Sequence, residues 1–133
     1  MNHIIRIHLE HKTDVIRDIK IPSHLSLEDL HNVIIKTLEL ENNEMASFYI
    51  TNDNLDLLEE IPLFKIDEKN SSMLDMSDIK ISSIFKNLNS QLIYIYDFLK
   101  MWRFLVSYEQ KTKDNTKKIE IIKSIGYMPK KAP

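Results

Sequence analysis

Cysteine is absent from the sequence, which has 133 residues. This absence excludes a disulfide framework, a thiolate nucleophile and any zinc or iron–sulfur site built on cysteine. No apolar run approaches the roughly 20 residues that a membrane-spanning helix needs. The first residues, MNHIIRIHLE, lack the basic start and the apolar core of a signal peptide. We therefore expect a cytoplasmic protein.

Glycine occurs once, as Gly126, where an average usage of about 7% predicts about nine. Loops that cradle phosphate groups and turns that expose a serine nucleophile need glycine, because their backbones adopt positive φ or approach a ligand closely. The sequence has no GxGxxG, GxxxxGK or GxSxG motif. Nucleotide-dependent and serine-hydrolase chemistries are therefore not expected, and we predict no catalytic residue and no cofactor.

Arginine is also scarce, with three residues against 15 lysines, and the net charge of −2 is unevenly distributed. Residues 1–109 carry 11 basic and 18 acidic side chains, whereas residues 110–133 carry seven lysines and two acids. A basic segment can bind phosphate backbones or an acidic partner, but a solvated end lying across the chain's own acidic body is the simpler interpretation. This basic tail comprises Lys111, Lys113, Lys117, Lys118, Lys123, Lys130 and Lys131.

A chain of this length is the size of one domain, and we expect a single domain over residues 1–125 followed by a flexible tail, 126–133. Alternating apolar residues predict an opening hairpin, with strands at 4–9 and 15–21. A helix over 26–40 is predicted by a capping box, in which Ser26 is the N-cap and Asp29 follows three residues later. Further strands are expected at 45–53, at 61–66 on a sheet edge because of Pro62, in the hairpin 92–110 and at 119–125, with helical turns at 81–87.

This order of elements predicts an α+β fold. We expect a mixed, mostly antiparallel sheet with the helix 26–40 packed on it, in an arrangement resembling the β-grasp of ubiquitin-like proteins.

The hairpin LIYIYDFLKMWRFLVSYEQ, residues 92–110, is the most apolar and aromatic stretch. Because the turn lacks glycine and asparagine, a four-residue loop over 98–101 is favoured, with Asp97 facing Trp102. That register predicts a buried face made of Ile93, Ile95, Trp102, Phe104, Val106 and Tyr108, and a mixed face that includes Tyr94, Tyr96, Arg103 and Ser107. A three-residue loop is the alternative. It would gather Tyr94, Tyr96, Phe98, Trp102 and Phe104 on one face, like a platform for stacking bases, and pair Asp97 with Arg103.

Either register leaves apolar side chains at the end of the hairpin. Such side chains seldom stay in water, so they are covered by the chain's own tail or acidic segment, or they bind a partner or a second copy. The candidate interaction surface comprises Phe98, Leu99, Met101, Tyr94, Tyr96 and Arg103.

The histidines and acids do not predict a metal site. His24 precedes the helix cap and His31 lies inside the helix, so the two do not face one ion. His3 and His8 fall on opposite faces of the first strand, and His11 lies in the turn after it. The acidic stretch DNLDLLEE, residues 53–60, lacks the ligand spacing and the glycine of an EF-hand loop.

Four segments together resemble a known family: IPSHLSLEDLHNVI (21–34), MASFYITND (45–53), ISSIF (81–85) and LIYIYDFLKMWRFLVSYE (92–109). The chain resembles the Ri-plasmid open-reading-frame-three-like family, also known as insertion-element passenger TnpR-like proteins, and within it a cysteine-free, Bacteroidetes-type branch. In the wider family the hairpin reads Tyr-Asp-Phe-Gly-Asp-x-Trp, whereas this chain has Leu99 and Lys100 in place of Gly-Asp. The resemblance implies an α+β domain associated with plasmids and mobile elements, and no activity.

The resolvase-type name of that family does not fit the residues. A serine resolvase needs a nucleophilic serine, an arginine cluster for the scissile phosphate and a helix-turn-helix. The three arginines here, Arg6, Arg17 and Arg103, are dispersed in the sequence. We therefore predict a non-enzymatic interaction domain that binds a protein partner or itself. The alternative is an accessory protein that binds nucleic acid through the lysine-rich end.

Overall fold

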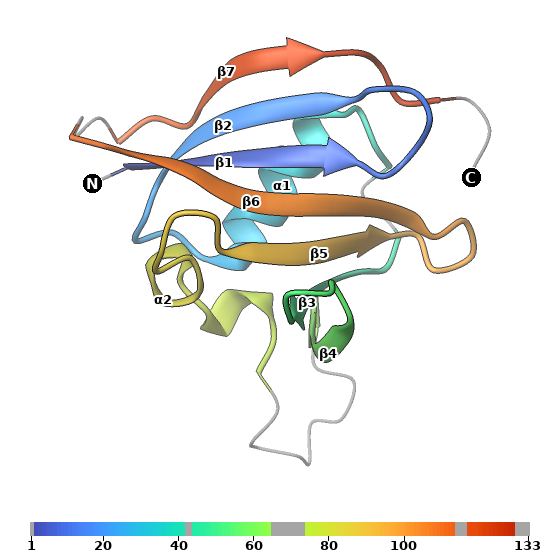
Figure 1. Cartoon of the computed structure of the whole chain (residues 1–133), viewed down its shortest axis with the longest axis horizontal. Helices are drawn as coiled ribbons and strands as arrows, with labels where there is room; N and C mark the ends of the chain where they lie inside the picture. Colours follow the sequence, from blue (N-terminus) through green and yellow to red (C-terminus); the bar gives the residue numbers. More distant parts are fainter. Residues whose placement is uncertain (1, 42–43, 65–73, 114–116, 130–133) are drawn as a thin grey trace.

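A computed structural model describes residues 2–41, 44–64, 74–113 and 117–129. Seven strands form one sheet in the order β4-β3-β5-β6-β1-β2-β7 (Figure 1). The helical elements are α1 (Leu27–Thr37), the 3-10 turn η1 (Met76–Asp78) and α2 (Ile81–Ile84). The strands are β1 (Asn2–Leu9), β2 (Ile16–Pro22), β3 (Ala46–Thr51), β4 (Leu57–Pro62), β5 (Gln91–Tyr96), β6 (Trp102–Thr112) and β7 (Glu120–Ile125).

The α+β, β-grasp-like prediction is wrong, and so is the expectation of a mixed sheet. Every pairing between neighbouring strands is antiparallel, and the sheet dominates the described part of the chain. Most elements lie close to their expected positions, but the edge strand expected at 61–66 is β4, which spans Leu57–Pro62. What the sequence pattern does not convey is that the strands after the helix join the opening hairpin on both of its sides.

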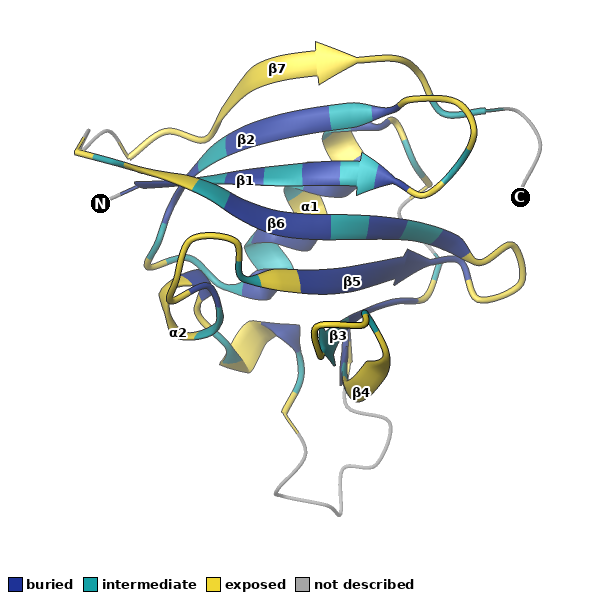
Figure 2. Cartoon of the chain, in the orientation of Figure 1, coloured by how far each residue is buried: buried dark blue, intermediate teal, exposed yellow. Residues whose placement is uncertain are grey.

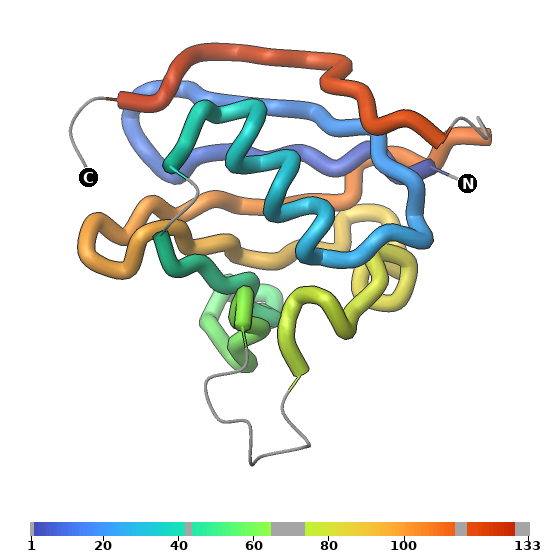
Figure 3. Tube along the Cα trace, turned by 180° about the vertical axis from the view of Figure 1, so that it is seen from behind, coloured from blue at the N-terminus to red at the C-terminus, as the bar shows by residue number. Residues whose placement is uncertain are grey.

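The helix α1 crosses one face of the sheet, as the view from behind shows (Figure 3). Its capping box is present: Ser26 Oγ accepts from the Asp29 backbone N–H, and the Asp29 carboxylate accepts from the Ser26 N–H. The helix buries Leu27, Leu30 and Ile34 against the sheet. The face that α1 does not cover is called the open face below.

Every second residue of the central strands is buried in the core beneath α1. On β1 these are Ile5, Ile7 and Leu9, and β2 adds Ile19 and Ile21. Burial of such aliphatic side chains is worth about 1.5–3 kcal/mol each and supplies most of the stability of a domain of this size. The open face carries the alternate residues of the same strands, many of them charged.

Strand β7 lies at one edge of the sheet, beside β2 (Figure 1). A buried arginine holds its end: Arg17 donates to the carbonyl oxygens of Ile125 and Gly126, each at 2.9 Å. Gly126 has φ +74°. Within the described residues, no helix is long and apolar enough to cross a membrane.

Candidate interaction surface

The hairpin of β5 and β6 has a register that neither expected loop provides. Tyr96 pairs with Trp102 and Tyr94 with Phe104, so the connection has five residues, Asp97 to Met101. The expected four-residue loop, with Asp97 facing Trp102, is therefore wrong. Five residues, like three, place the tyrosines on the same face as Trp102 and Phe104.

That aromatic face is the core rather than a platform for bases. Tyr94 and Phe104 are fully buried, and Tyr96 and Trp102 nearly so, beneath α1. The Tyr94 ring centroid lies 4.8 Å from that of Phe48 and 5.9 Å from that of Phe104. The structure therefore separates Tyr94 and Tyr96 from the exposed residues with which the sequence grouped them.

Ile93 and Ile95 lie on the other face of β5, outside the core cluster that the expected register assigned to them. They pair with Leu105 and Arg103 of β6 and are nonetheless buried. Trp102, Phe104, Val106 and Tyr108 belong to the core as expected. The prediction therefore exchanged the two faces of β5 and assigned those of β6 correctly.

Asp97 fixes the shape of the connection between β5 and β6. Its carboxylate accepts hydrogen bonds from the backbone N–H groups of Leu99 (3.1 Å) and Lys100 (3.4 Å), and its carbonyl oxygen accepts from the Met101 N–H. Its own N–H donates to the Met45 carbonyl at 2.8 Å. Asp97 and Met101 both have positive φ, near 60° and 54°. Aspartate tolerates this conformation because its short side chain bonds the local backbone.

The end of this connection exposes three apolar side chains, Phe98, Leu99 and Met101, which we call the tip. Their exposed fractions are 38%, 97% and 49%. Figure 2 shows the connection as an exposed loop that projects beyond the buried strands β5 and β6. The tip is therefore an exposed apolar loop whose backbone is held by hydrogen bonds to Asp97.

An acidic concavity of about 190 Å³ lies at the base of the tip. Glu39, Glu41 and Glu44 line it together with Tyr96 and Lys100, and Met128 and Pro129 of the segment after β7 line it as well. The Tyr96 hydroxyl donates to the Glu41 carbonyl, and burial, aided by the neighbouring acids, raises the pKa of Tyr96 to about 12. The tyrosine thus stays protonated and ties the hairpin to the segment that follows α1.

Arg103, the last residue of the predicted surface, lies on the open face and not at the tip. It forms an ion pair with Glu10, with Nε 2.8 Å from Oε2, and donates to the Leu55 carbonyl at 3.4 Å. The structure therefore brings Phe98, Leu99 and Met101 together and leaves Arg103 in a separate polar contact.

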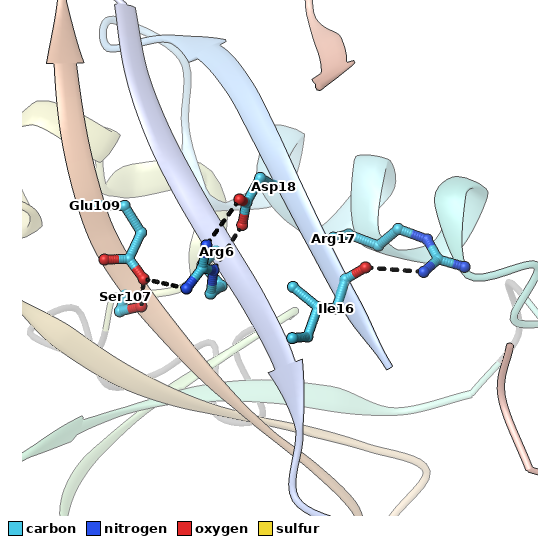
Figure 4. A network of polar contacts seen from close by, with 6 residues as sticks. All are labelled: Arg6, Ile16, Arg17, Asp18, Ser107 and Glu109. Atoms are coloured by element: carbon cyan, nitrogen blue, oxygen red, sulfur yellow. Dashed lines mark hydrogen bonds and ion pairs between the residues drawn. The ribbon is translucent and has the colours of Figure 1, made fainter. Parts of the chain in front are cut away.

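A second polar network occupies the open face across β6, β1 and β2 (Figure 4). Arg6 makes a two-pronged contact with Asp18, at 2.8 and 3.0 Å, and its Nη1 lies 3.4 Å from Glu109. The hydrogen bond to Asp18 raises the pKa of Arg6. Ser107 donates to Glu109 at 3.2 Å. The three arginines therefore lie apart in the structure as well, and each binds a different part of the chain.

Two of the histidines, His31 and His3, are buried packing residues. His31 Nδ1 and the Tyr94 hydroxyl share a buried hydrogen bond of 2.7 Å, and burial lowers the pKa of His31 to about 4. His3 stacks on Tyr108 with ring centroids 4.0 Å apart, and burial lowers its pKa as well. In the part of the chain that the structure describes, no group of three or more His, Asp or Glu side chains could hold a metal ion.

Five lysines of the predicted basic tail are described, and Lys130 and Lys131 lie outside the described residues. Lys111 is the last residue but one of β6 and Lys113 follows the strand, whereas Lys117 and Lys118 precede β7. All four are exposed. Lys123 is different, because it lies within β7 opposite Asp18 of β2.

Sequence reasoning missed two features of this surface. The role of Asp97 could have been suspected, since aspartate is, after glycine and asparagine, among the residues that most readily adopt positive φ. The cluster in which Ser47 and Tyr49 donate to Glu60, at 2.8 and 3.0 Å, depends on the pairing of β3 with β4 and carries no local signal.

The fold and the sequence were both compared with known proteins. No match was found among curated proteins. The crystal structure of "Protein of Unknown Function MM3350 from Methanosarcina mazei Go1" has the same fold, with a TM-score of 0.74 over 92% of this chain and 68% of that chain, at 20% sequence identity. The sequence also matches the family described as "Plasmid pRiA4b ORF-3-like protein" over residues 2–130. The chain therefore belongs to the family of plasmid pRiA4b ORF-3-like proteins.

Proposed function

We propose that the chain is a cytoplasmic, non-enzymatic interaction domain whose tip binds a partner protein. The observation that carries this proposal is Leu99, which is 97% exposed at the end of a loop held by Asp97. A held loop loses little conformational entropy on binding, so its apolar side chains can contribute their full burial to affinity.

The surroundings of the tip favour a particular kind of partner. Glu39, Glu41 and Glu44 border the concavity beside it, and Lys100 is the basic side chain on that side. Residues 1–109 carry an excess of seven acidic side chains. The partner should therefore present an apolar pocket with a basic rim, because complementary charges steer association and exclude other surfaces.

Site-directed photo-crosslinking tests this proposal. The photoreactive amino acid benzoylphenylalanine is placed at position 99, and in a matched control at Leu88, an exposed leucine in the loop before β5. Both variants are expressed in cells that produce the chain naturally, irradiated, and their adducts are identified by mass spectrometry. We expect one discrete protein adduct at position 99 that is absent from the control.

Binding of the identified protein is then measured by calorimetry with purified components. Leu99→Asp should weaken binding about tenfold or more, as expected for a central apolar contact, and Leu88→Asp should leave it unchanged. Equal adducts at both positions, or equal binding by both variants, would contradict the proposal. A nuclease-sensitive adduct would instead favour nucleic-acid binding by the exposed lysines around the β6–β7 connection.

A further inference from the structure

We propose that β7 pairs antiparallel with β7 of a second copy of this chain, so that the sheet continues across a two-fold axis. This self-association uses an edge strand of the sheet, whereas the tip lies at the end of the β5–β6 hairpin, and it does not depend on the tip's partner. The sheet has two edges, β4 and β7, and they differ in how well they resist pairing with another strand.

The β4 edge is protected against self-pairing. The strand ends in Pro62, which has no N–H to donate, and it carries Glu59 and Glu60 side by side. A two-fold antiparallel copy centred on Glu59 or on Glu60 would place that glutamate opposite the same glutamate of its partner. Like charges directly opposite one another disfavour pairing, as is common on edges that proteins keep monomeric.

The β7 edge has the opposite character. Every residue of β7 is exposed, as Figure 2 shows, although the strand is rich in isoleucine. Four isoleucines within and just before β7 have exposed fractions of 38–47%: Ile119, Ile121, Ile122 and Ile125. An apolar edge strand without proline is a template for another strand.

The sequence of β7 is self-complementary in one antiparallel register. A bulge at Ile122 places Glu120 and Lys123 of β7 on the same face of the sheet, because Asp18 faces Lys123 whereas Ile19 faces Ile121. When Ile121 of one copy faces Ile122 of the other, Glu120 of each copy can therefore face Lys123 of the other. Two opposite-charge pairs thereby flank an isoleucine centre, and both favour association. Charge complementarity of this kind is what selects a second copy as the occupant over an unrelated strand.

Charges already alternate along a row that leads across the open face to this edge. Glu109 of β6 lies 3.4 Å from Arg6 of β1, Arg6 lies 2.8 Å from Asp18 of β2, and Asp18 faces Lys123 of β7 in the strand register. Glu120 of a second copy would add the next charge, again of opposite sign. The β7 edge thus ends a row of alternating charges that a second copy continues.

On the helix side, the same edge borders an apolar groove of about 370 Å³. Val33, Lys36 and Thr37 of α1 form one wall, and Ile119 and Ile121 form the other. A neighbouring β7 would bring further isoleucines beside this groove and remove them from water. Pairing of one six-residue strand buries less surface than a standard interface, so association should depend on concentration.

Charge reversal with complementation tests the register directly. Glu120→Lys places lysines at both members of each pair, and Lys123→Glu places acids at both, so each variant alone should remain monomeric. An equimolar mixture restores two opposite-charge pairs and should form a heterodimer. Mass is measured by sedimentation velocity over a range of concentrations at low salt, with circular dichroism to check that both variants fold.

Wild-type protein should shift toward the dimer mass as concentration rises, and Leu99→Asp should do the same because the tip is elsewhere. Persistent dimers in both charge variants, loss of dimer in Leu99→Asp, or a mixture that stays monomeric would each overturn the proposal. Failure of the tip to bind a partner would not affect this result, so the two proposals fail independently.

The absence of cysteine offers a second measurement that does not need a stable dimer. In a mixture of Ile121→Cys and Ile122→Cys chains, mild oxidation should trap a disulfide-linked pair more rapidly than in either variant alone. Equal trapping in the mixture and in the separate variants would overturn the register. A wild-type monomer at every concentration, together with no preferential trapping, would overturn the proposal as a whole.

Discussion

At the scale of single residues, burial of His31 couples stability to pH. Its hydrogen bond with Tyr94 lies inside the core, and burial lowers its pKa from 6.5 to about 4. The sequence indicated that His31 lies inside the helix expected over 26–40. It could not indicate the partner, since Tyr94 is 63 residues away and was assigned to the other face.

This shift predicts an acid-dependent loss of stability. The unfolded chain binds a proton at His31 near pH 6.5, whereas the native chain does so only near pH 4. The free energy of unfolding should therefore decrease as pH falls through this window, by up to about 3 kcal/mol, and be unaffected by His31 above it. Urea unfolding at a series of pH values measures the slope.

A variant pair isolates the contribution of this side chain. His31→Gln should flatten the dependence between pH 6.5 and 4, although His3, whose pKa burial also lowers, retains a smaller slope of the same sign. His24→Gln, at an exposed position, is the matched control for the removal of a histidine. Identical slopes in wild type and His31→Gln would show that His31 is not held neutral in the native state.

At the scale of elements, the helix was predictable because its signals are local. The capping box lies within four residues, and its two hydrogen bonds form as the spacing indicates. The hairpin of β5 and β6 was not predictable to the same degree. Its register depends on the positive φ of Asp97 and Met101, and these residues give a weaker signal than glycine or asparagine would.

Ser26→Ala should lower the free energy of unfolding by about 1 kcal/mol, because the Asp29 N–H at the start of α1 loses its acceptor. Chemical denaturation measures the change. Ser82→Ala, on the exposed side of α2, is a matched control and should stay within about 0.5 kcal/mol of wild type. Equal effects of the two substitutions would mean that the cap contributes nothing beyond ordinary serine solvation.

At the scale of the whole molecule, the order of the strands in the sheet could not be predicted from the sequence. Each strand could be located by its pattern, but the order β4-β3-β5-β6-β1-β2-β7 requires pairings between strands far apart in the chain, such as β1 with β6. A pattern of local periodicity has no information about which strands become neighbours. For the same reason the tip could be identified as exposed, whereas the β7 edge could not.

The single glycine lies where the end of β7 meets the turn between β1 and β2. Gly126 has φ +74°, and a Cβ at this position would lie 2.1 Å from the Asp14 carbonyl oxygen. Its own carbonyl accepts from Arg17. Positive φ and close approach both require glycine here, so the one glycine of the sequence serves to hold the end of β7 against the turn between β1 and β2.

Gly126→Ala should therefore release the end of β7 and lower the free energy of unfolding by about 1–2 kcal/mol or more. Positive φ is unfavourable for alanine, and its Cβ would also have to displace the turn between β1 and β2. Thermal unfolding measures the loss, and hydrogen exchange of the β7 amides should accelerate more than that of β1. Tyr127→Ala, at the next and largely exposed residue, should change neither quantity appreciably. Unaltered exchange in Gly126→Ala would mean that β7 is held by its pairing with β2 alone, and the Arg17 contact would then be a consequence of docking rather than its cause.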